Sequence, residues 1–414
     1  METEEYVERL DEEFYKLPSQ TDLDGAASGI ITLQETYLLY PENITSGAIT
    51  GKPTFLGPEA AYHLAMVAKE QKKFQHAFLW AWEGLKQLEQ GTLSTVTKVE
   101  FLAVLSTSAF EFGNLPLAII STQQLVNQDP TNEPARNVLS TFKLLYRVLT
   151  PTPNRDIFTL QPSNSSYEAL CRGEGIKMTP RRQRALFCRY STGGGNPRLM
   201  YAPVKEEDEW DNPPIKRYHD IISEKEMATL KTLSRPKLSR TSVYHSEEGS
   251  GISSNRVSQG SLACVSYSVF LKDVEDPVLA RISQRIADIT GLDMESADRL
   301  QVANYGVGGH FKPHTDSLVR PRLSITQDRI ATVLIYLSDV QSGGATVFPE
   351  IGAALQVQKG SAVFWYNLLR SGEEDDNTLH AGCPVLNGSK WIANKWIHER
   401  GQEFRRQCSL SAFE

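Results

Sequence analysis

The most visible absence in this sequence of 414 residues is any run of about 18 apolar residues, the length that spans a bilayer. The chain also has no Lys/Arg-rich block interleaved with aromatic residues, and its net charge is −7, so nothing indicates nucleic-acid binding. Residues 1–16 are charged throughout and lack the basic start and apolar stretch of a signal peptide, which taken alone favours the cytosol. These absences leave an ordinary globular protein, long enough for about two or three domains.

Cysteine is scarce, with five residues in the chain. Cys171 and Cys188 flank a basic segment, Cys383 and Cys408 bracket the C-terminal segment, and Cys264 is left over. This spacing leaves two interpretations open, namely disulfide bonds formed in an oxidising compartment or buried thiols.

The N-terminal part of the chain has helical periodicity. Residues 1–50 mix helical and turn signals and are typical of the end of a helical region. Residues 58–150 contain five amphipathic stretches, at 60–68, 74–88, 99–112, 115–126 and 136–149. Turn residues about every 15–20 positions favour an α-solenoid of the tetratricopeptide kind, and an ordinary helical bundle is the alternative.

The pattern changes after this helical region. Residues 151–215 are predicted to form a linker and arm, in which the charged run 205–210 is a solvated edge. Residues 216–414 contain a predicted helix at 277–290 and short β-branched or aromatic runs at 300–305, 330–337, 361–366 and 391–397, divided by glycine-rich turns. Short strands separated by such turns predict a sandwich or jelly roll.

A candidate metal site begins with His314 and Asp316, two positions apart, and is completed by His380 much further along the chain. In a strand, residues i and i+2 project to the same side, so the first pair reaches one ion if this stretch is extended. Two imidazoles and one carboxylate occupy one face of an octahedral Fe(II) and leave the other face open. Each histidine taken singly is more typical of an ordinary surface or core residue.

Lys390 lies in a stretch whose alternation places Lys390, Ile392 and Asn394 on one face. If that face lines a barrel, the buried ammonium needs an anionic partner, which one carboxylate of a dicarboxylate cosubstrate supplies. If the face lies outside, Lys390 is solvated, as Lys395 is expected to be. Tyr305 and Thr332 are polar-tipped residues on predicted strands, and their default interpretation is core packing with one hydrogen bond.

Beyond these spacings, long stretches of the sequence resemble the collagen prolyl 4-hydroxylase α subunits. The similar stretches are 171–177 with 188–190, 305–316, 343–349, 362–367 and 380–406. The resemblance covers about residues 20–408 and implies an α+β multidomain protein. Its tetratricopeptide-like peptide-binding domain would span 58–150, and a C-terminal double-stranded β-helix (jelly-roll) dioxygenase domain would span 216–414. Residues 1–50 would be a remnant of the N-terminal dimerisation region.

The resemblance also implies roles for single residues. His314, Asp316 and His380 would bind Fe(II), and Lys390 would bind the distal carboxylate of 2-oxoglutarate. The further expected site residues are His398 for cosubstrate handling and catalysis, Tyr305 for catalysis and the pocket, and Thr332 for the cosubstrate pocket. The implied reaction is hydroxylation at C4 of peptidyl proline with O2, coupled to decarboxylation of 2-oxoglutarate to succinate and CO2, with L-ascorbate restoring oxidised iron.

The same resemblance implies disulfides Cys171–Cys188 and Cys383–Cys408, residence in the endoplasmic reticulum lumen, and an α2β2 tetramer whose β subunit is protein disulfide isomerase. In that compartment Asn43 and Asn164 are candidate glycosylation sites, because each begins an N-x-S/T sequon.

Two departures from the family pattern qualify these expectations. Thr107 and Phe110 stand where the family has tyrosines in its peptide groove, so the preference for collagen-type repeats is open. Residues 256–264 diverge from the strand that usually precedes the core. The alternatives are a hydroxylase of another proline-containing protein and a peptide-binding assembly subunit without catalysis. A metal-dependent hydrolase is least favoured, since no general base with suitable spacing stands near the ligands.

Overall fold

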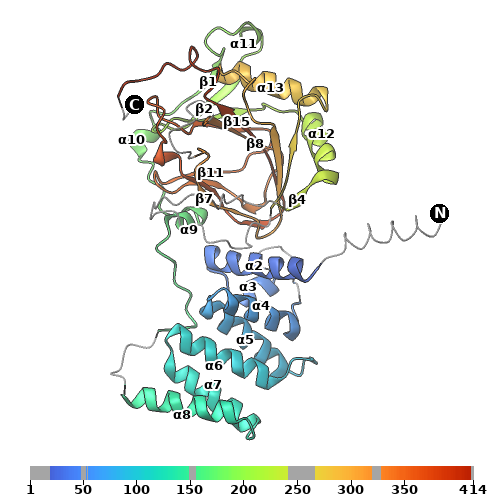
Figure 1. Ribbon diagram of the computed structural model, residues 1–414, viewed down its shortest axis with the longest axis vertical. Coiled ribbons are helices and arrows are strands. Elements are labelled where there is room, and N and C mark those ends of the chain that lie inside the picture. Colours follow the sequence, from blue (N-terminus) through green and yellow to red (C-terminus); the bar gives the residue numbers. More distant parts are fainter. Residues whose placement is uncertain are drawn as a thin grey trace, which may run out of the picture. The chain divides into compact units, whose positions relative to one another are not determined.

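The computed structural model describes residues 19–47, 53, 55–148, 155–240, 266–318 and 328–411. It divides the chain into two compact units, Met1–Pro162 and Ser163–Glu414. The first is helical and the second is built on β-sheets (Figure 1), so the predicted order of a helical region followed by a strand-rich domain is confirmed. The N-terminal segment 1–16, the divergent segment 256–264 and Cys264 within it lie outside the described residues.

The helical unit follows the predicted periodicity closely. Its helices are α2 (Gln20–Tyr37), α3 (Pro41–Thr45), α4 (Pro58–Glu70), α5 (Phe74–Glu89), α6 (Lys98–Phe112), α7 (Leu115–Gln128) and α8 (Glu133–Val148). From α4 to α8 each helix packs against the next, as in a solenoid. Local signals set the boundaries: α6 begins after Thr97, which accepts a hydrogen bond from the N–H of Glu100, and ends at Gly113 in the left-handed conformation.

Close packing between α5 and α6 makes the core of this unit. Phe78, Trp80 and Phe101 are fully buried there. The indole Nε1 of Trp80 donates to the side-chain oxygen of Gln34 on α2 at 2.6 Å, so the buried N–H is satisfied and α2 is joined to the solenoid. Among the described residues no helix is both long enough and apolar enough to cross a membrane.

The second unit carries its helices around two sheets. The helices are α9 (Ser166–Cys171), α10 (Pro180–Gln183), α11 (Pro197–Tyr201), α12 (Glu224–Ser234) and α13 (Pro277–Thr290), with 3₁₀ turns η1 (Arg235–Lys237) and η2 (Asp376–Thr378). The amphipathic pattern of α13 buries Leu279, Ile282 and Ile286 in the core beneath the larger sheet. This helix has the bounds that the sequence predicts.

Nine strands form the larger sheet within the described ranges. In spatial order they are β1 (Cys188–Ser191), β2 (Val204–Trp210), β3 (Ile215–His219), β12 (Ala362–Tyr366), β8 (Arg329–Tyr336), β15 (Lys390–His398), β6 (Leu300–Tyr305), β5 (Ser266–Leu271) and β4 (Ser239–Arg240). The smaller sheet has the order β11 (Ala353–Leu355), β10 (Thr346–Phe348), β13 (His380–Gly382) and β7 (Phe311–His314), and β14 (Val385–Asn387) pairs with β9 (Ser342–Gly343). Each pairing is antiparallel, as in a jelly roll.

Part of the segment predicted to be a linker and arm belongs to this sheet. Strands β1, β2 and β3 come from residues 188–219 and extend the sheet beyond β12. The charged run 205–210 is β2 itself, where Glu206 is 4% exposed and pairs with Arg189 and Lys216. The expectation of a solvated edge is therefore wrong, because flanking strands supply cations that satisfy the buried carboxylate.

Both disulfide pairings expected from the resemblance are wrong in this structure. Cys171 is bonded to Cys383, with Cα atoms 5.5 Å apart. Helix α9 packs on β10 and β11, which places its last residue beside the segment that follows β13. In the described part of the chain Cys188 and Cys408 are exposed free thiols. Adjacency in sequence did not decide the pairing, since α9 contacts the smaller sheet whereas Cys188 lies on β1 at the edge of the larger one.

We expect peptide mapping of the non-reduced protein to recover a peptide pair that joins Cys171 to Cys383. Cys171→Ser should lower the stability of the second unit by about 2–5 kcal/mol, because this cross-link closes a long loop. Cys188→Ser is the matched control and should leave the unfolding midpoint unchanged. A peptide pair that joins Cys171 to Cys188 would contradict the assignment.

Candidate metal centre and cosubstrate cavity

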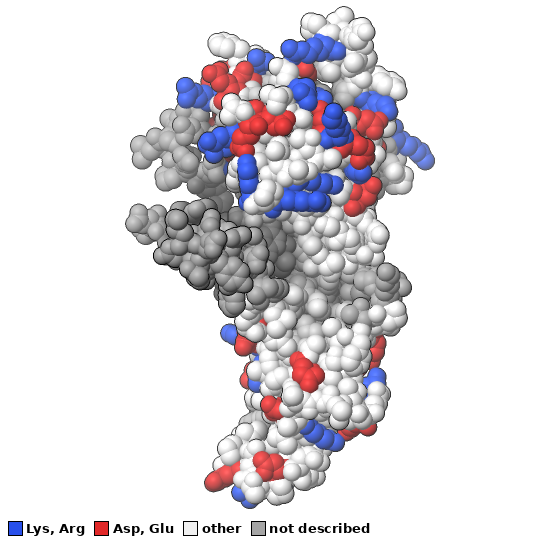
Figure 2. All heavy atoms as spheres, turned by 90° about the vertical axis from the view of Figure 1, so that its right-hand side faces the viewer, with Lys and Arg blue, Asp and Glu red and all other residues white. Residues whose placement is uncertain are grey.

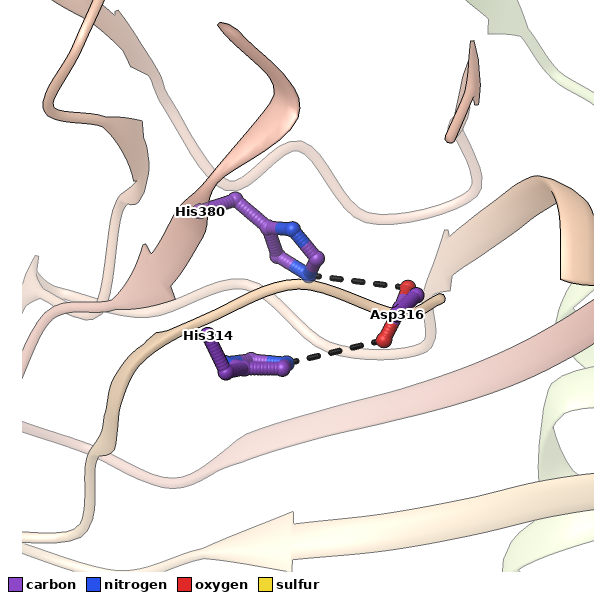
Figure 3. Close-up of side chains that lie close together, drawn as sticks. All are labelled: His314, Asp316 and His380. Atoms are coloured by element: carbon purple, nitrogen blue, oxygen red, sulfur yellow. Dashed lines mark ion pairs between the residues drawn. The ribbon is translucent and has the colours of Figure 1, made fainter. Parts of the chain in front are cut away.

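Antiparallel pairing of β13 with β7 brings two distant histidines together. His380, the first residue of β13, lies opposite His314, the last residue of β7, and their ring centroids are 4.4 Å apart. Asp316 follows two residues after the end of β7, so the extended stretch is shorter than predicted. Nε2 of His314 lies 3.6 Å from Oδ1 of Asp316, and Nε2 of His380 lies 3.6 Å from Oδ2 (Figure 3).

Main-chain carbonyls fix the tautomer of both imidazoles. Nδ1 of His314 donates to the carbonyl of Lys312 at 2.8 Å, and Nδ1 of His380 donates to that of Thr378 at 2.9 Å. Each Nε2 therefore carries the lone pair, directed toward Asp316 (Figure 3). The three side chains each offer a ligand atom, and these atoms lie within 4.8 Å of one another. Within the part of the chain that the structure describes, this donor set fits a non-haem Fe(II) centre.

Burial sets the protonation of this cluster. It lowers the pKa of His380 to about 4, against the opposing effect of Asp316, so the ring is neutral and able to bind a metal at neutral pH. Burial alone would raise the pKa of Asp316, but attraction to His380 and His314 when either ring is protonated, together with the hydrogen bond from the Thr332 hydroxyl, holds that pKa below its usual range. Asp316 is 6% exposed and is therefore a buried carboxylate.

The cluster opens into a cavity of about 630 Å³ between the two sheets. Lys390, Ile392 and Asn394 of β15 all line it, which confirms that this face points inward. Lys390 is 4% exposed, so the alternative of a solvated lysine is wrong. The comparison residue Lys395 is also buried, at 3%, because the outer face of β15 is covered as well.

The ammonium of Lys390 has a neutral partner. Its Nζ donates to the carbonyl of Gly344 at 2.6 Å, and it lies 5.9 and 5.8 Å from the ring centroids of Tyr305 and Tyr336. Among the described residues no carboxylate pairs with it. Burial therefore lowers the pKa of Lys390 to about 7. A buried cation that faces a cavity without a counter-ion is suited to an anionic ligand.

Three further polar side chains lie in or beside this cavity, and the sequence predicted a role for only one of them. Thr332, expected at the cosubstrate, lines the cavity and donates its hydroxyl to Oδ2 of Asp316 at 2.6 Å. Thr346 was missed: it lines the cavity, is buried, and its Oγ1 lies 2.8 Å from the hydroxyl of Tyr336. Asn367, buried beside Thr332, was also missed. Thr346 begins a strand of three residues after a glycine pair, and Asn367 directly follows the end of β12. At neither position is the alternation of apolar and polar residues long enough to predict which face of the sheet the side chain joins.

His398 lies at the far end of β15. It is not among the residues that line the described cavity, and its Nε2 is 3.1 Å from Oδ1 of Asp298. Asp298 also accepts from Arg329, whose guanidinium stacks over the cavity residue Trp396 at 4.0 Å. His398 is thus next to the cavity wall, and its expected role in catalysis stays a prediction.

Comparison with known families assigns each part of the chain. Residues 300–398 match the 2OG-Fe(II) oxygenase superfamily, and 58–147 match the prolyl 4-hydroxylase peptide-substrate-binding domain. Residues 1–51 match the N-terminal region of the prolyl 4-hydroxylase α subunit. The rat prolyl 4-hydroxylase subunit alpha-1 is 45% identical over 96% of this chain and 77% of its own length. The chain belongs to the prolyl 4-hydroxylase α-subunit family.

Further relatives agree with this assignment. Human subunit alpha-1 is 44% identical over 96% of this chain and 77% of its own, and chicken subunit alpha-2 is 45% identical over 94% and 76%. The solved structure of a viral collagen prolyl hydroxylase from Paramecium bursaria Chlorella virus-1 matches with a TM-score of 0.36 and 22% identity, over 44% of this chain and 94% of that one. A TM-score that low does not establish a common fold.

The resemblance recognised in the sequence is therefore confirmed, and so is the enzyme class. Membership in the 2OG-Fe(II) oxygenase superfamily implies Fe(II) and 2-oxoglutarate as metal and cosubstrate. The donor set His314, Asp316 and His380 and the buried ammonium of Lys390 fit these two groups.

Binding of 2-oxoglutarate should be linked to proton uptake by Lys390. With a pKa of about 7 in the free protein, Lys390 is mostly neutral at pH 8, and an adjacent carboxylate raises the pKa and restores the charge. Calorimetric titration with N-oxalylglycine, a 2-oxoglutarate analogue, in buffers of different ionisation enthalpy should show uptake of nearly one proton at pH 8. At pH 6 the lysine is already charged, and uptake should be small.

Lys390→Met is the control for this measurement and should remove the uptake along with most of the affinity. Equal proton uptake at pH 6 and pH 8 would contradict the assignment of this lysine as the linked group.

Proposed function

We propose that this chain is the catalytic α subunit of a prolyl 4-hydroxylase, which hydroxylates C4 of peptidyl proline in collagen-like X-Pro-Gly sequences. The reaction is coupled to decarboxylation of 2-oxoglutarate to succinate and CO2. The observation that carries the proposal is one cavity that holds both a His314–Asp316–His380 cluster and a buried, unneutralised Lys390.

When bound, Fe(II) and 2-oxoglutarate supply the activation of O2, which side chains cannot perform. The residues of the chain supply the geometry. The Nε2 atoms of His314 and His380, with Asp316, would hold the metal, and Lys390 would receive the distal carboxylate of the cosubstrate. Tyr305 of β6 lies beside that ammonium, Thr346 of β10 lines the same cavity from the smaller sheet, and the enclosing strands keep bulk water away from the reacting atoms.

The domain roles follow from the same proposal. Residues 216–414, joined in one sheet by strands from the arm 151–215, form the catalytic domain, and residues 58–150 bind the peptide. On its visible face the helical unit carries few charged side chains, whereas acidic and basic groups intermingle on the sheet-rich unit (Figure 2). A sparsely charged surface suits a proline-rich chain, which is pre-extended as polyproline II and binds to aromatic surfaces at low entropic cost.

A second candidate is a hydroxylase of another proline-containing protein, and the helical unit favours it on one observation. The hydroxyl of Thr107 donates within its own helix to the carbonyl of Ala103 at 3.0 Å. Phe110, 38% exposed, stacks on Phe142 with ring centroids 4.6 Å apart. These two positions therefore offer a peptide an apolar ring and no free hydroxyl, in contrast to tyrosines.

The surroundings of the enzyme are part of the proposal. We assign it to the endoplasmic reticulum lumen, in an α2β2 tetramer with protein disulfide isomerase, and L-ascorbate as the reductant of oxidised iron. A disulfide between Cys171 and Cys383 supports an oxidising compartment. Asn164 is exposed ahead of α9 and is the better-placed glycan acceptor, whereas Asn43 is half-buried in α3 and its oxygen accepts from the N–H of Tyr40.

The test is release of CO2 from labelled 2-oxoglutarate, with Fe(II), ascorbate and a (Pro-Pro-Gly) peptide, using chain co-expressed with protein disulfide isomerase. We expect the peptide to stimulate turnover, and His380→Ala to abolish it because the metal loses a ligand. His219→Ala is the matched control, since His219 lies on β3 and pairs with Glu207 outside the cavity.

The other outcomes separate the alternatives. Stimulation by a non-collagen proline peptide alone would favour the second hydroxylase. Tight peptide binding without turnover by the wild type would indicate an assembly subunit. Full activity of His380→Ala would refute the ligand assignment.

A further inference from the structure

The carboxylate of Asp316 accepts a hydrogen bond from a chain of two buried polar side chains, Thr332 and Asn367. Thr332, 1% exposed, lies on the central strand β8, and its hydroxyl donates to Oδ2 of Asp316 at 2.6 Å. A hydroxyl has one proton to donate, so toward a second group the Thr332 oxygen acts as an acceptor. That group is the side chain of Asn367, also 1% exposed, whose Nδ2 lies 3.0 Å from Oγ1 of Thr332.

The orientation of the Asn367 amide is determined by its second contact. Its Nδ2 also donates to the main-chain carbonyl of Arg329 at 3.2 Å, and a carbonyl can only accept. The amide nitrogen must therefore face Arg329 and Thr332. Backbone contacts hold Asn367 in place, since its N–H donates to the carbonyl of Ile330 at 2.9 Å and its carbonyl accepts from the N–H of Asp375 at 3.0 Å.

Oδ1 of Asn367 also lies 3.2 Å from the Thr332 hydroxyl, but Oδ2 of Asp316 is the closer and the charged acceptor, so the donors run from Asn367 through Thr332 to Asp316. We propose that Asn367 is a positioning residue for the metal centre, which acts through Thr332 to hold the Asp316 carboxylate in a single orientation. The inference rests on the proposed function, because a fixed orientation of the carboxylate matters only if Asp316 is a metal ligand.

The physical consequence concerns how Asp316 presents its two oxygens. Each oxygen lies 3.6 Å from one imidazole, Oδ1 from Nε2 of His314 and Oδ2 from Nε2 of His380, but only Oδ2 also accepts the Thr332 hydroxyl, at 2.6 Å. A carboxylate tied down at one oxygen offers the other as a single ligand and does not swing to chelate with both. One oxygen with two imidazoles leaves positions on the metal open for the keto acid and O2.

Four variants test the inference, with Co(II) as an air-stable probe of the site. Thr332→Val removes the hydroxyl and keeps the shape, and Asn367→Leu removes the donor that orients it. Both should weaken Co(II) binding about 10–100-fold by calorimetry and alter the visible Co(II) spectrum. Thr332→Ser keeps the hydroxyl and should restore most of the affinity.

Asn304→Leu is the matched control. The Nδ2 of Asn304 also donates to a hydroxyl, that of Ser389 at 2.8 Å, but this pair does not touch a candidate ligand. It should leave Co(II) affinity unchanged. Circular dichroism and thermal melting establish that each variant is folded, and Thr332→Val still decides the outcome if Asn367→Leu does not fold.

Wild-type affinity in folded Thr332→Val and Asn367→Leu would overturn the inference and leave the proposed function intact. A wild-type protein that binds no Co(II) at a site dependent on His380 would instead refute the proposed function. Loss of affinity in Thr332→Ser equal to that in Thr332→Val would also contradict the inference, because the hydroxyl would then have no part in it.

Discussion

The register of β13 on β7 is the constraint on which the rest of the second unit depends. It sets His380 opposite His314, and because side chains alternate along a strand, a slip of one residue would turn His380 away from Asp316. Neighbouring contacts hold β13 in this register. It pairs on its other side with β10, the N–H of Cys383 donates to the carbonyl of Ala345 at 2.8 Å, and the disulfide ties the same residue to α9.

Lys390 is a second constraint, because burying its ammonium destabilises the free protein. A buried ammonium with only a carbonyl partner disfavours its charged form, which is why its pKa falls to about 7. Since the unfolded lysine keeps its ordinary pKa, the penalty is full below pH 7 and is relieved as pH rises from there toward the unfolded value. An aliphatic side chain of similar length would pack at that position without this penalty. The position of Lys390 on β15 therefore fits a ligand that carries a carboxylate.

Periodicity predicted the elements that bury one regular face. The helices between 58 and 150, α13 and β6 appear close to their expected bounds, and alternation along β15 correctly placed Lys390 with Ile392 and Asn394. It failed where burial depends on distant partners. Glu206 and Lys395 are buried because other strands and helices cover them, and the partner of Cys171 depends on where α9 packs. No local pattern carries that information.

The helical unit, which matches the prolyl 4-hydroxylase peptide-substrate-binding domain, carries an aromatic pair at one of the two positions that differ from the expected tyrosines. The ring of Phe110 on α6 stacks on the buried ring of Phe142 on α8 and leaves an apolar aromatic surface exposed. A tyrosine at the same place would add a hydroxyl that donates a hydrogen bond to a peptide carbonyl at one fixed position. Without that donor, binding depends on shape and on the extended conformation of the peptide. Under the proposed function, selectivity for proline persists, because proline stiffens the chain, while selectivity for one repeat over another weakens.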